Sequence, residues 1–463
     1  MQKNKTEQDF MIHGPIMKVI LTISAPLMLN NLVRTLYTVT DGLYVAQLSA
    51  EDFAATAFTW PLNFLFISIG MGIGVAATAL IAQHIGAKQN NFVRSYIDNT
   101  LLITSLAGLT IAFFGYLLTP WMLRLMGGQG QFLEKAIIYL QINFIGIIFD
   151  FGFFGYQAIL NAQGKTKTIT LISAISMFLN IILDPFFIYQ KVPVIGLAGL
   201  GMGIAGAAWA TIIAKIVLYL LAISAVHRQT PIPMKFLSWQ YQPAISWHIL
   251  KVALPSSMGY SGAALGFTVM NSLIQSYGTN TLAAFSMVNR ISDLLMQPQL
   301  GIGMALTSII GQNMGARQYD RSFLIFKRAI QFIMLMSVIA SALVLIFKDQ
   351  VLGIFIAGQA DPDLWLQAKE YVDYTAFIIF FMGLFSAFNG FFQGCGQTKY
   401  AMYMSVGRLW FIRLPLIMIM SYFTDLGSTG IWIAMLLSNM LIVLYGYYIY
   451  RTRNWTSLIQ ARS

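Results

Sequence analysis

The sequence predicts an all-α integral membrane protein with twelve transmembrane helices, arranged as two parallel six-helix repeats around a central cavity. Hydrophobic residues make up 57% of the chain and charged residues 10%, which leaves more apolar surface than a soluble core can bury. Apolar runs of about 20 residues, long enough to cross about 30 Å of hydrocarbon as a helix, recur along the chain. The segment Gly72 to Gln89 returns in the second half as Gly301 to Gln318, with ten of eighteen positions identical.

The apolar runs give the expected helices in order. They lie near residues 17–43, 53–82, 95–118, 136–160, 168–190, 203–226, 247–275, 282–310, 324–347, 372–393, 401–423 and 430–450. The strands of a membrane barrel are about ten residues long and alternate with period two, whereas these runs are longer and do not alternate. The first run follows a polar start and has no small-residue cleavage site, which favours a retained helix over a signal peptide.

The repeat divides the chain into an N-terminal half, residues 1–230, and a C-terminal half, residues 231–463, joined by a linker at about 226–246. Six helices are an even number, so both halves enter the membrane in the same direction and are related by an axis along the membrane normal. Two parallel halves with a substrate site between them suit alternating access, in which the halves rock so that the site opens to one side of the membrane at a time. A simple channel does not need two such halves.

The net charge of +11 is distributed asymmetrically. If both termini are cytoplasmic, the inner segments and helix edges carry 18 Lys and Arg residues and the outer segments carry five. This bias predicts a multi-pass protein of the plasma (inner) membrane with both termini inside. The same bias explains the positive net charge, so nucleic-acid binding is not needed to account for it. The sequence has no patch of basic and aromatic residues outside the membrane loops that would bind nucleic acid.

The sequence has no motif typical of a metal site or of an enzyme active site. The chain has one cysteine, Cys395, no His, Cys or carboxylate group with metal-ligand spacing, and no phosphate-binding GxxxxGK[ST] loop. No cofactor is therefore expected. An intramembrane enzyme remains an alternative of a different class, but it lacks a paired nucleophile and base.

The first helix carries one polar stripe. Asn30, Arg34, Tyr37 and Asp41 fall within about 60° of each other on a helical wheel, so the stripe must turn away from lipid. Pro26 removes a backbone donor and makes the helix easy to bend. A charge at the bilayer centre costs about 2.5–3.5 kcal/mol, which makes Asp41 a functional candidate. The alternative is that Asp41 only pairs with Arg34.

A second polar group lies in the fifth helix. Asn180 and Asp184 are four residues apart and share one helical face, and Pro185 leaves the carbonyl of Ile181 free. An amide, a carboxyl and a free carbonyl together can hold a proton or coordinate a hard cation through oxygen atoms. The alternative is an ordinary helix end, where Asp before Pro forms a turn.

These motifs, taken in order, resemble the multidrug and toxic compound extrusion (MATE) family. The resemblance rests on Pro26 followed by Asp41, the twice-used [AG]Q-x-x-GA-[KR] turn, the segment from Asn180 to Pro185, and GIAGAAWA at Gly203 to Ala210. It covers about residues 14–450. It implies twelve helices in two lobes and cation-driven export of drugs.

The resemblance also implies site residues. In the proton-coupled, DinF-like branch of the family, the cation site of the N-terminal lobe matches Asp41, Asn180, Asp184 and Thr211 of this chain. The other branch uses acidic residues of the C-terminal lobe, and here Met270 stands where the repeat places Asp41. The implied coupling ion is H⁺, with Na⁺ at the same four residues as the alternative.

The other charged or polar groups in the helices have less certain roles. Asp150 and Lys215 could neutralise one another as a buried pair or tune Asp184, and Tyr139 and Gln157 could extend the network or simply pack. In the C-terminal half we expect Arg290 and Asp293 to form a structural pair. We expect Arg408 and Arg413 to reach the interface or brace helix ends.

Together these features predict a secondary transporter. We expect a multidrug efflux antiporter that exports organic, cationic amphipathic compounds in exchange for protons by alternating access. The alternatives are a sodium-coupled exporter of the same family and a flippase for lipid-linked sugars. The expected partners are small organic cations and drugs and membrane lipids, with no nucleic acid, and the expected state is a monomer.

Overall fold

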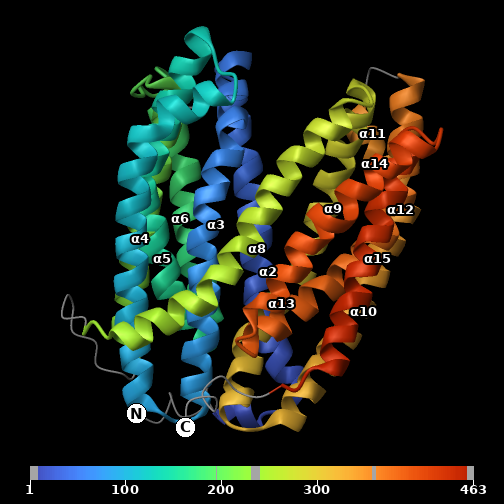
Figure 1. Ribbon diagram of the computed structural model, residues 1–463. Coiled ribbons are helices and arrows are strands. Elements are labelled where there is room, and N and C mark those ends of the chain that lie inside the picture. Colours follow the sequence, from blue (N-terminus) through green and yellow to red (C-terminus); the bar gives the residue numbers. More distant parts are fainter. Residues whose placement is uncertain (1–8, 194–195, 231–239, 357–360, 456–463) are drawn as a thin grey trace.

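The computed structural model describes residues 9–193, 196–230, 240–356 and 361–455 as a helical protein (Figure 1). Among these residues the only β pairing is one antiparallel bridge between Lys191 and Ala198. The N-terminal half contains α2 Ile16–Ala46, α3 Ala50–Gly86, α4 Asn90–Leu125, α5 Gly130–Ala162, α6 Thr166–Ile188 and α7 Gly203–Gln229. The C-terminal half contains α8 Pro243–Gln275, α9 Thr279–Gly315, α10 Tyr319–Ile346, α11 Lys348–Ile356, α12 Pro362–Gly394, α13 Thr398–Val406, the π-helix η1 Gly407–Arg413, α14 Leu414–Phe423 and α15 Ser428–Thr452.

Twelve membrane-length helical segments confirm the predicted fold class. Within the described residues, 11 are long and apolar enough to cross a membrane, and α13, η1 and α14 together count as one of them. The twelfth is α8, which has 33 residues and the length of its neighbours, but Pro255, Ser256 and Ser257 interrupt its apolar run. The sequence did not predict the separate short helix α11 or the π-helix inside the run at 401–423.

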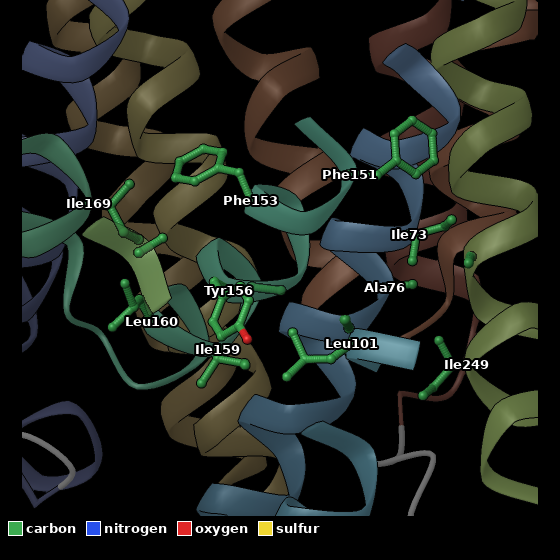
Figure 2. Close-up of a cluster of buried hydrophobic side chains, with 14 of the residues drawn as sticks. Ile73, Ala76, Leu101, Phe151, Phe153, Tyr156, Ile159, Leu160, Ile169 and Ile249 are labelled. Carbon is green, nitrogen blue, oxygen red and sulfur yellow. The ribbon is translucent and has the colours of Figure 1, made fainter. Parts of the chain in front are cut away.

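The largest hydrophobic core of each half includes residues from the first helix of the other half, and the C-terminal half has a second core built around Met270, Tyr371 and Trp432. Figure 2 shows the first core, which contains residues of α3, α4, α5 and α6, and Ile249 of α8 lies at its edge on the side of α3 and α4. In return, Val19 and Ile20 of α2 are fully buried in the core built by α9, α10 and α12. The boundary predicted at 230/231 separates the repeats in sequence, while α2 and α8 each pack into both halves. Residues 231–239 of the predicted linker lie outside the described residues.

Threonine hydroxyls support the backbone of both exchanged helices near their prolines. Thr166 Oγ1 donates to the Ile23 carbonyl at 2.9 Å, and Thr170 Oγ1 donates to the Pro26 carbonyl at 2.7 Å. In the second half, Thr398 Oγ1 donates to the Val252 carbonyl at 2.6 Å. The helix α2 continues through Pro26. The carbonyls around this proline therefore have partners in α6, which ties α2 to the N-terminal half.

The glycines of the sequence repeat allow the two halves to approach closely. A Cβ atom at Gly72 would overlap the backbone of Ser257, and one at Gly301 would overlap the backbone of Met28. The repeat matches Gly72 to Gly301, and the same offset along the chain matches Met28 to Ser257. The repeat thus produces the same contact twice, once between α3 and α8 and once between α9 and α2.

A second symmetric pair of contacts joins α3 to α9 near their C-terminal ends. A Cβ at Gly86 would overlap the Gln312 carbonyl, and one at Gly315 would overlap the Gln83 carbonyl. The Gln83 side chain donates to the Gly394 carbonyl at 2.9 Å, and the Gln312 side chain donates to the Ala162 carbonyl at 2.7 Å. Backbone contact and reciprocal hydrogen bonds therefore close the two halves together at this end.

The closed end is the end that carries the turns between α3 and α4 and between α9 and α10 (Figure 1). From there the ribbons of the two halves diverge toward the end that carries the turn between α4 and α5 and the helix α11. The two closest symmetric contacts therefore sit at one end of the molecule, and the arrangement is asymmetric across the membrane.

Replacing Gly86 by alanine tests the closed end. Overpacking a tight contact costs about 1–3 kcal/mol, so Gly86→Ala should lower the melting temperature of the purified protein in detergent. The matched control is Gly353→Ala, because a Cβ at Gly353 meets nothing within 4 Å. Equal melting temperatures for the two variants would show that the close approach at Gly86 does not hold the halves together.

Candidate functional site

Two carboxyl groups meet in the N-terminal half. Asp41 of α2 is half-buried and Asp184 of α6 is fully buried, and the two lie within hydrogen-bonding distance of each other. The Asn180 side chain donates to Asp184 Oδ1 at 2.7 Å, as expected for residues on one helical face. Asp41 Oδ1 and Asp184 Oδ2 are buried and have no donor from the described protein. The sequence could not show that the first and fifth expected helices bring these carboxyls into contact.

Hydroxyl groups from three helices lie near the two carboxyls or near each other. Tyr37, one turn before Asp41 on α2, lies close to Thr211 on α7 and is in electrostatic range of both carboxyls. Tyr139 on α5 is in electrostatic range of the same carboxyls. The candidate site therefore combines side chains from α2, α5, α6 and α7, which the packing of these four helices places together.

A salt bridge borders this cluster. Lys215 Nζ lies 2.7 Å from Asp150 Oδ2, and the two side chains are 16% and 14% exposed. The structure thus answers the question that the sequence left open: these residues form a pair. Lys215 is also in electrostatic range of Asp41, so it adds positive potential to the cluster while its charge is matched by Asp150.

The contact between Asp41 and Asp184 constrains the chemistry of the site. Two ionised carboxylates in contact repel strongly where water is excluded, so the arrangement requires a proton or a cation between them. Among the described residues, the cation that acts on this pair is Lys215, which is already paired with Asp150. The oxygen atoms of the carboxyls, of Asn180 and of the Thr211 hydroxyl are hard ligands suited to H⁺ or Na⁺.

No hydrogen bond or ion pair among the described residues joins three of the predicted residues to this cluster. Asn30 is buried and its Oδ1 has no donor among the described residues, Arg34 is exposed, and Gln157 is half-buried. No ion pair within the described ranges joins Arg34 to Asp41, so the alternative in which Asp41 serves only to pair with Arg34 is wrong. In the described part of the chain, no three His, Cys, Asp or Glu side chains are grouped to hold a metal ion.

Comparison with known proteins places the chain in a family. Residues 26–186 and 255–419 match the family described as MatE, one match in each half. The chain belongs to the MatE family. The two matches begin at Pro26 and Pro255, which the sequence repeat also lays on one another, so the family pattern recurs with the spacing found in the sequence. The protein is thus a multi-pass MATE transporter and not an enzyme.

Relatives and solved structures agree with this assignment along nearly the whole chain. The chain is 26% identical over 447 residues to "Probable multidrug resistance protein YoeA" of Bacillus subtilis (strain 168), covering 94% of each protein. It is 26% identical over 450 residues to YpnP, also called a probable multidrug resistance protein, of the same organism, covering 96% of this chain and 97% of the relative. A MATE crystal structure described as "in the bent conformation" superposes with a TM-score of 0.88 at 26% identity, covering 96% of this chain and 97% of that one.

The C-terminal half of this MATE protein has different chemistry at the matching positions. Met270 stands where the repeat places Asp41, and it is fully buried. Arg290 and Asp293 are both exposed and form no ion pair with each other, so the predicted structural pair is wrong. Their spacing along α9 allows such a pair, but two exposed side chains gain little from forming it.

Arg408 and Arg413 also differ from expectation. They are 5% and 2% exposed and lie inside the C-terminal half, so they neither reach the membrane interface nor brace a helix end. The π-helix η1 redirects this stretch inward, and a π-helix leaves no periodic signal in the sequence. Sequence analysis also missed Gln83 and Gln312, although the identity of the two glutamines within the repeat was an available signal.

Breaking the Asp150–Lys215 pair should leave an uncompensated buried charge. We expect Lys215→Met to lower the free energy of unfolding by about 3 kcal/mol, and Asp150→Leu with Lys215→Met to recover most of the loss. The measurement is reversible unfolding in mixed micelles across a double-mutant cycle. Additive losses in the double variant would mean that the two side chains are not coupled.

Proposed function

We propose that this MATE protein is a multidrug efflux antiporter that exports organic, cationic amphipathic compounds in exchange for protons by alternating access. The observation that carries the proposal is the contact between Asp41 and Asp184, two carboxyls without a cation from the described residues between them. Such a pair takes up or releases one positive charge readily, because the doubly ionised state is repulsive and the protonated state gains a hydrogen bond. Asn180 and Thr211 complete the coupling site.

The position of Asp41 on α2 links protonation of its carboxyl to movement of the two halves. Asp41 belongs to α2, whose other end is buried in the core of the C-terminal half at Val19 and Ile20. A change of charge at Asp41 alters the contact of α2 with α6, and α2 passes the change to the opposite half. Pro26 lies between the two ends and lacks a backbone donor, so α2 bends there at low cost.

The closed end of the molecule supports an outward-facing assignment. The turns at this end carry Lys88 and Arg317, and the bias of basic residues places them in the cytoplasm. With both termini cytoplasmic, the contacts of Gln83 and Gln312 close the protein toward the inside. Export then requires these contacts to break so that the site opens inward, and to reform after the drug is bound.

The substrate class rests on the relatives and on the charge of the site. YoeA and YpnP are named probable multidrug resistance proteins. The cluster of Asp41, Asp184, Asp150 and Lys215 has more negative than positive groups, which favours cationic compounds over anions when the site is deprotonated. Because the acidic cluster lies in the N-terminal half, it also fits the DinF-like branch implied by the resemblance.

Sodium is the second candidate ion. The oxygens of Asp41, Asn180, Asp184 and Thr211 could coordinate Na⁺ in place of a proton. The two ions are distinguished in vesicles by imposing either a pH gradient without sodium or a sodium gradient at constant pH. Export driven by the pH gradient alone is expected; export driven only by sodium would assign Na⁺ to the site.

Removing either carboxyl should uncouple the transporter. In vesicles containing Asp41→Asn or Asp184→Asn protein, uphill export of a fluorescent organic cation should fall about 5–150-fold, the usual range of a coupling free energy. Equilibrium binding of the same dye should change much less. Asp293→Asn is the matched control, because Asp293 is an exposed carboxyl on a membrane helix. Unimpaired pH-driven export by either test variant would rule out this mechanism.

Locking the closed end should stop transport reversibly. The Cβ position at Gly311 lies 2.9 Å from Ala82 Cβ, and a disulfide needs about 3.5–4.5 Å, so a small shift admits a bridge between α9 and α3. In a Cys395→Ala background, Ala82→Cys with Gly311→Cys should lose transport on oxidation and regain it on reduction. Each single cysteine variant is the control. Full transport by the oxidised double variant would contradict alternating access through this end.

A further inference from the structure

Two buried guanidinium groups lie side by side in the C-terminal half. Arg408 and Arg413 both belong to the π-helix η1, and their charges are close enough to repel. Neither forms an ion pair with any carboxylate of the described residues. A single unpaired charge in the membrane is already costly, and two neighbouring charges of the same sign are more so.

The protein supplies few acceptors for these donors. Each guanidinium has five N–H groups, yet both arginines converge on one neutral oxygen, Asn439 Oδ1, at 3.1 Å each. The other acceptors are the Ser438 hydroxyl for Arg413 and the sulfur atoms of Met382 and Met270, which accept weakly.

Arg408 is the less satisfied of the two arginines. Its Nε is buried and has no partner among the described residues. Its guanidinium carbon lies 4.7 Å from the ring centroid of Phe385, so one face is covered by an aromatic ring. The site therefore has spare donors in a buried environment, where an additional negative acceptor would be stabilised strongly.

The π-helix explains how the two side chains come together. In a regular α-helix, residues five apart differ by about 140° around the axis, so Arg408 and Arg413 would point to different neighbours. The wider turn of η1 places both against Asn439 of α15. Such π segments occur often at functional sites.

The pair also stands opposite in charge to the cluster of the N-terminal half. Arg413 reaches Met270, the residue that the repeat matches to Asp41. The contact joins η1 to α8 in the C-terminal half much as the contact of Asp184 with Asp41 joins α6 to α2. The two halves thus present a pair of acids and a pair of bases in related surroundings.

We propose that Arg408 and Arg413 form a binding site for a small anion, either chloride or the carboxylate group of a transported compound. The anion takes hydrogen bonds from both guanidinium groups beside Asn439 and supplies the missing negative charge. Met270 and Met382 line the site with flexible thioethers, which move aside to admit it. The inference is independent of the coupling ion in the N-terminal half.

The test is the melting temperature of the full-length purified protein in sodium chloride, sodium benzoate and sodium gluconate at equal sodium concentration. Chloride represents the free ion, benzoate represents a substrate carboxylate on an apolar group, and gluconate is the strongly hydrated polyhydroxy anion that serves as the reference salt. Ligands that bind the folded state stabilise it, so chloride, benzoate or both should raise the melting temperature by roughly 2 °C or more over gluconate.

Three variants decide whether the arginines are responsible. Arg413→Gln should abolish the difference between the anions, whereas Arg228→Gln, at an exposed arginine in the last turn of α7, should retain it. Asn439→Asp places a carboxylate between the two arginines, so its melting temperature should be high in gluconate and insensitive to the anion. This variant keeps the test decisive if Arg413→Gln does not fold.

The outcomes separate clearly. A response to chloride that is lost in Arg413→Gln or Asn439→Asp assigns a halide site, and a response to benzoate alone assigns a substrate carboxylate. A wild-type protein that melts at the same temperature in all three salts would overturn the proposal. So would an anion effect of the same size in wild type and Asn439→Asp.

Discussion

Close backbone contact at the repeated glycines is the constraint on which the rest of the structure depends. Gly86 and Gly315 bring α3 and α9 together. Gly72 brings α3 against α8, and Gly301 brings α9 against α2. Without a hydrophobic driving force between helices in lipid, such contacts are a main source of association in membranes. The closed end, the exchanged first helices and the position of Asp41 relative to both cores all follow from this packing.

The two clusters of charge are consequences of how each half uses the same scaffold. In the N-terminal half, α2 and α6 bring two carboxyls into contact and α7 adds a hydroxyl and an ammonium group. In the C-terminal half, an apolar Met270 replaces the first acid and η1 turns two arginines inward. A duplicated scaffold therefore does not require duplicated chemistry, and the asymmetry lies in a few side chains.

Much of this could be predicted from the sequence, because hydrophobic run length and an ungapped repeat report directly on membrane helices and on their pairing. The shared face of Asn180 and Asp184 follows from their spacing. Contacts between helices do not, since helical periodicity gives the face of a residue but not its neighbour. For that reason the sequence alone does not decide whether Asp150 and Lys215 pair.

The wrong predictions have physical causes as well. Arg34 shares a helical stripe with Asp41, but a long side chain can extend away from the face on which it starts, and here it is exposed. A regular helix through η1 would carry Arg408 and Arg413 to other neighbours, and only the π-helix turns both inward. The roles assigned to the site residues by resemblance remain proposals, and the structure contributes their geometry.

The exchange of first helices has a consequence for how the protein is made. Ile249 of α8 completes the core of the first half, and Ile20 of α2 belongs to the core of the second. As the chain leaves the ribosome, six helices can enter the bilayer before the seventh exists, and during that interval the first half lacks part of its interior. Assembly of either half must therefore wait for the other, so the two repeats reach their native packing together rather than in sequence.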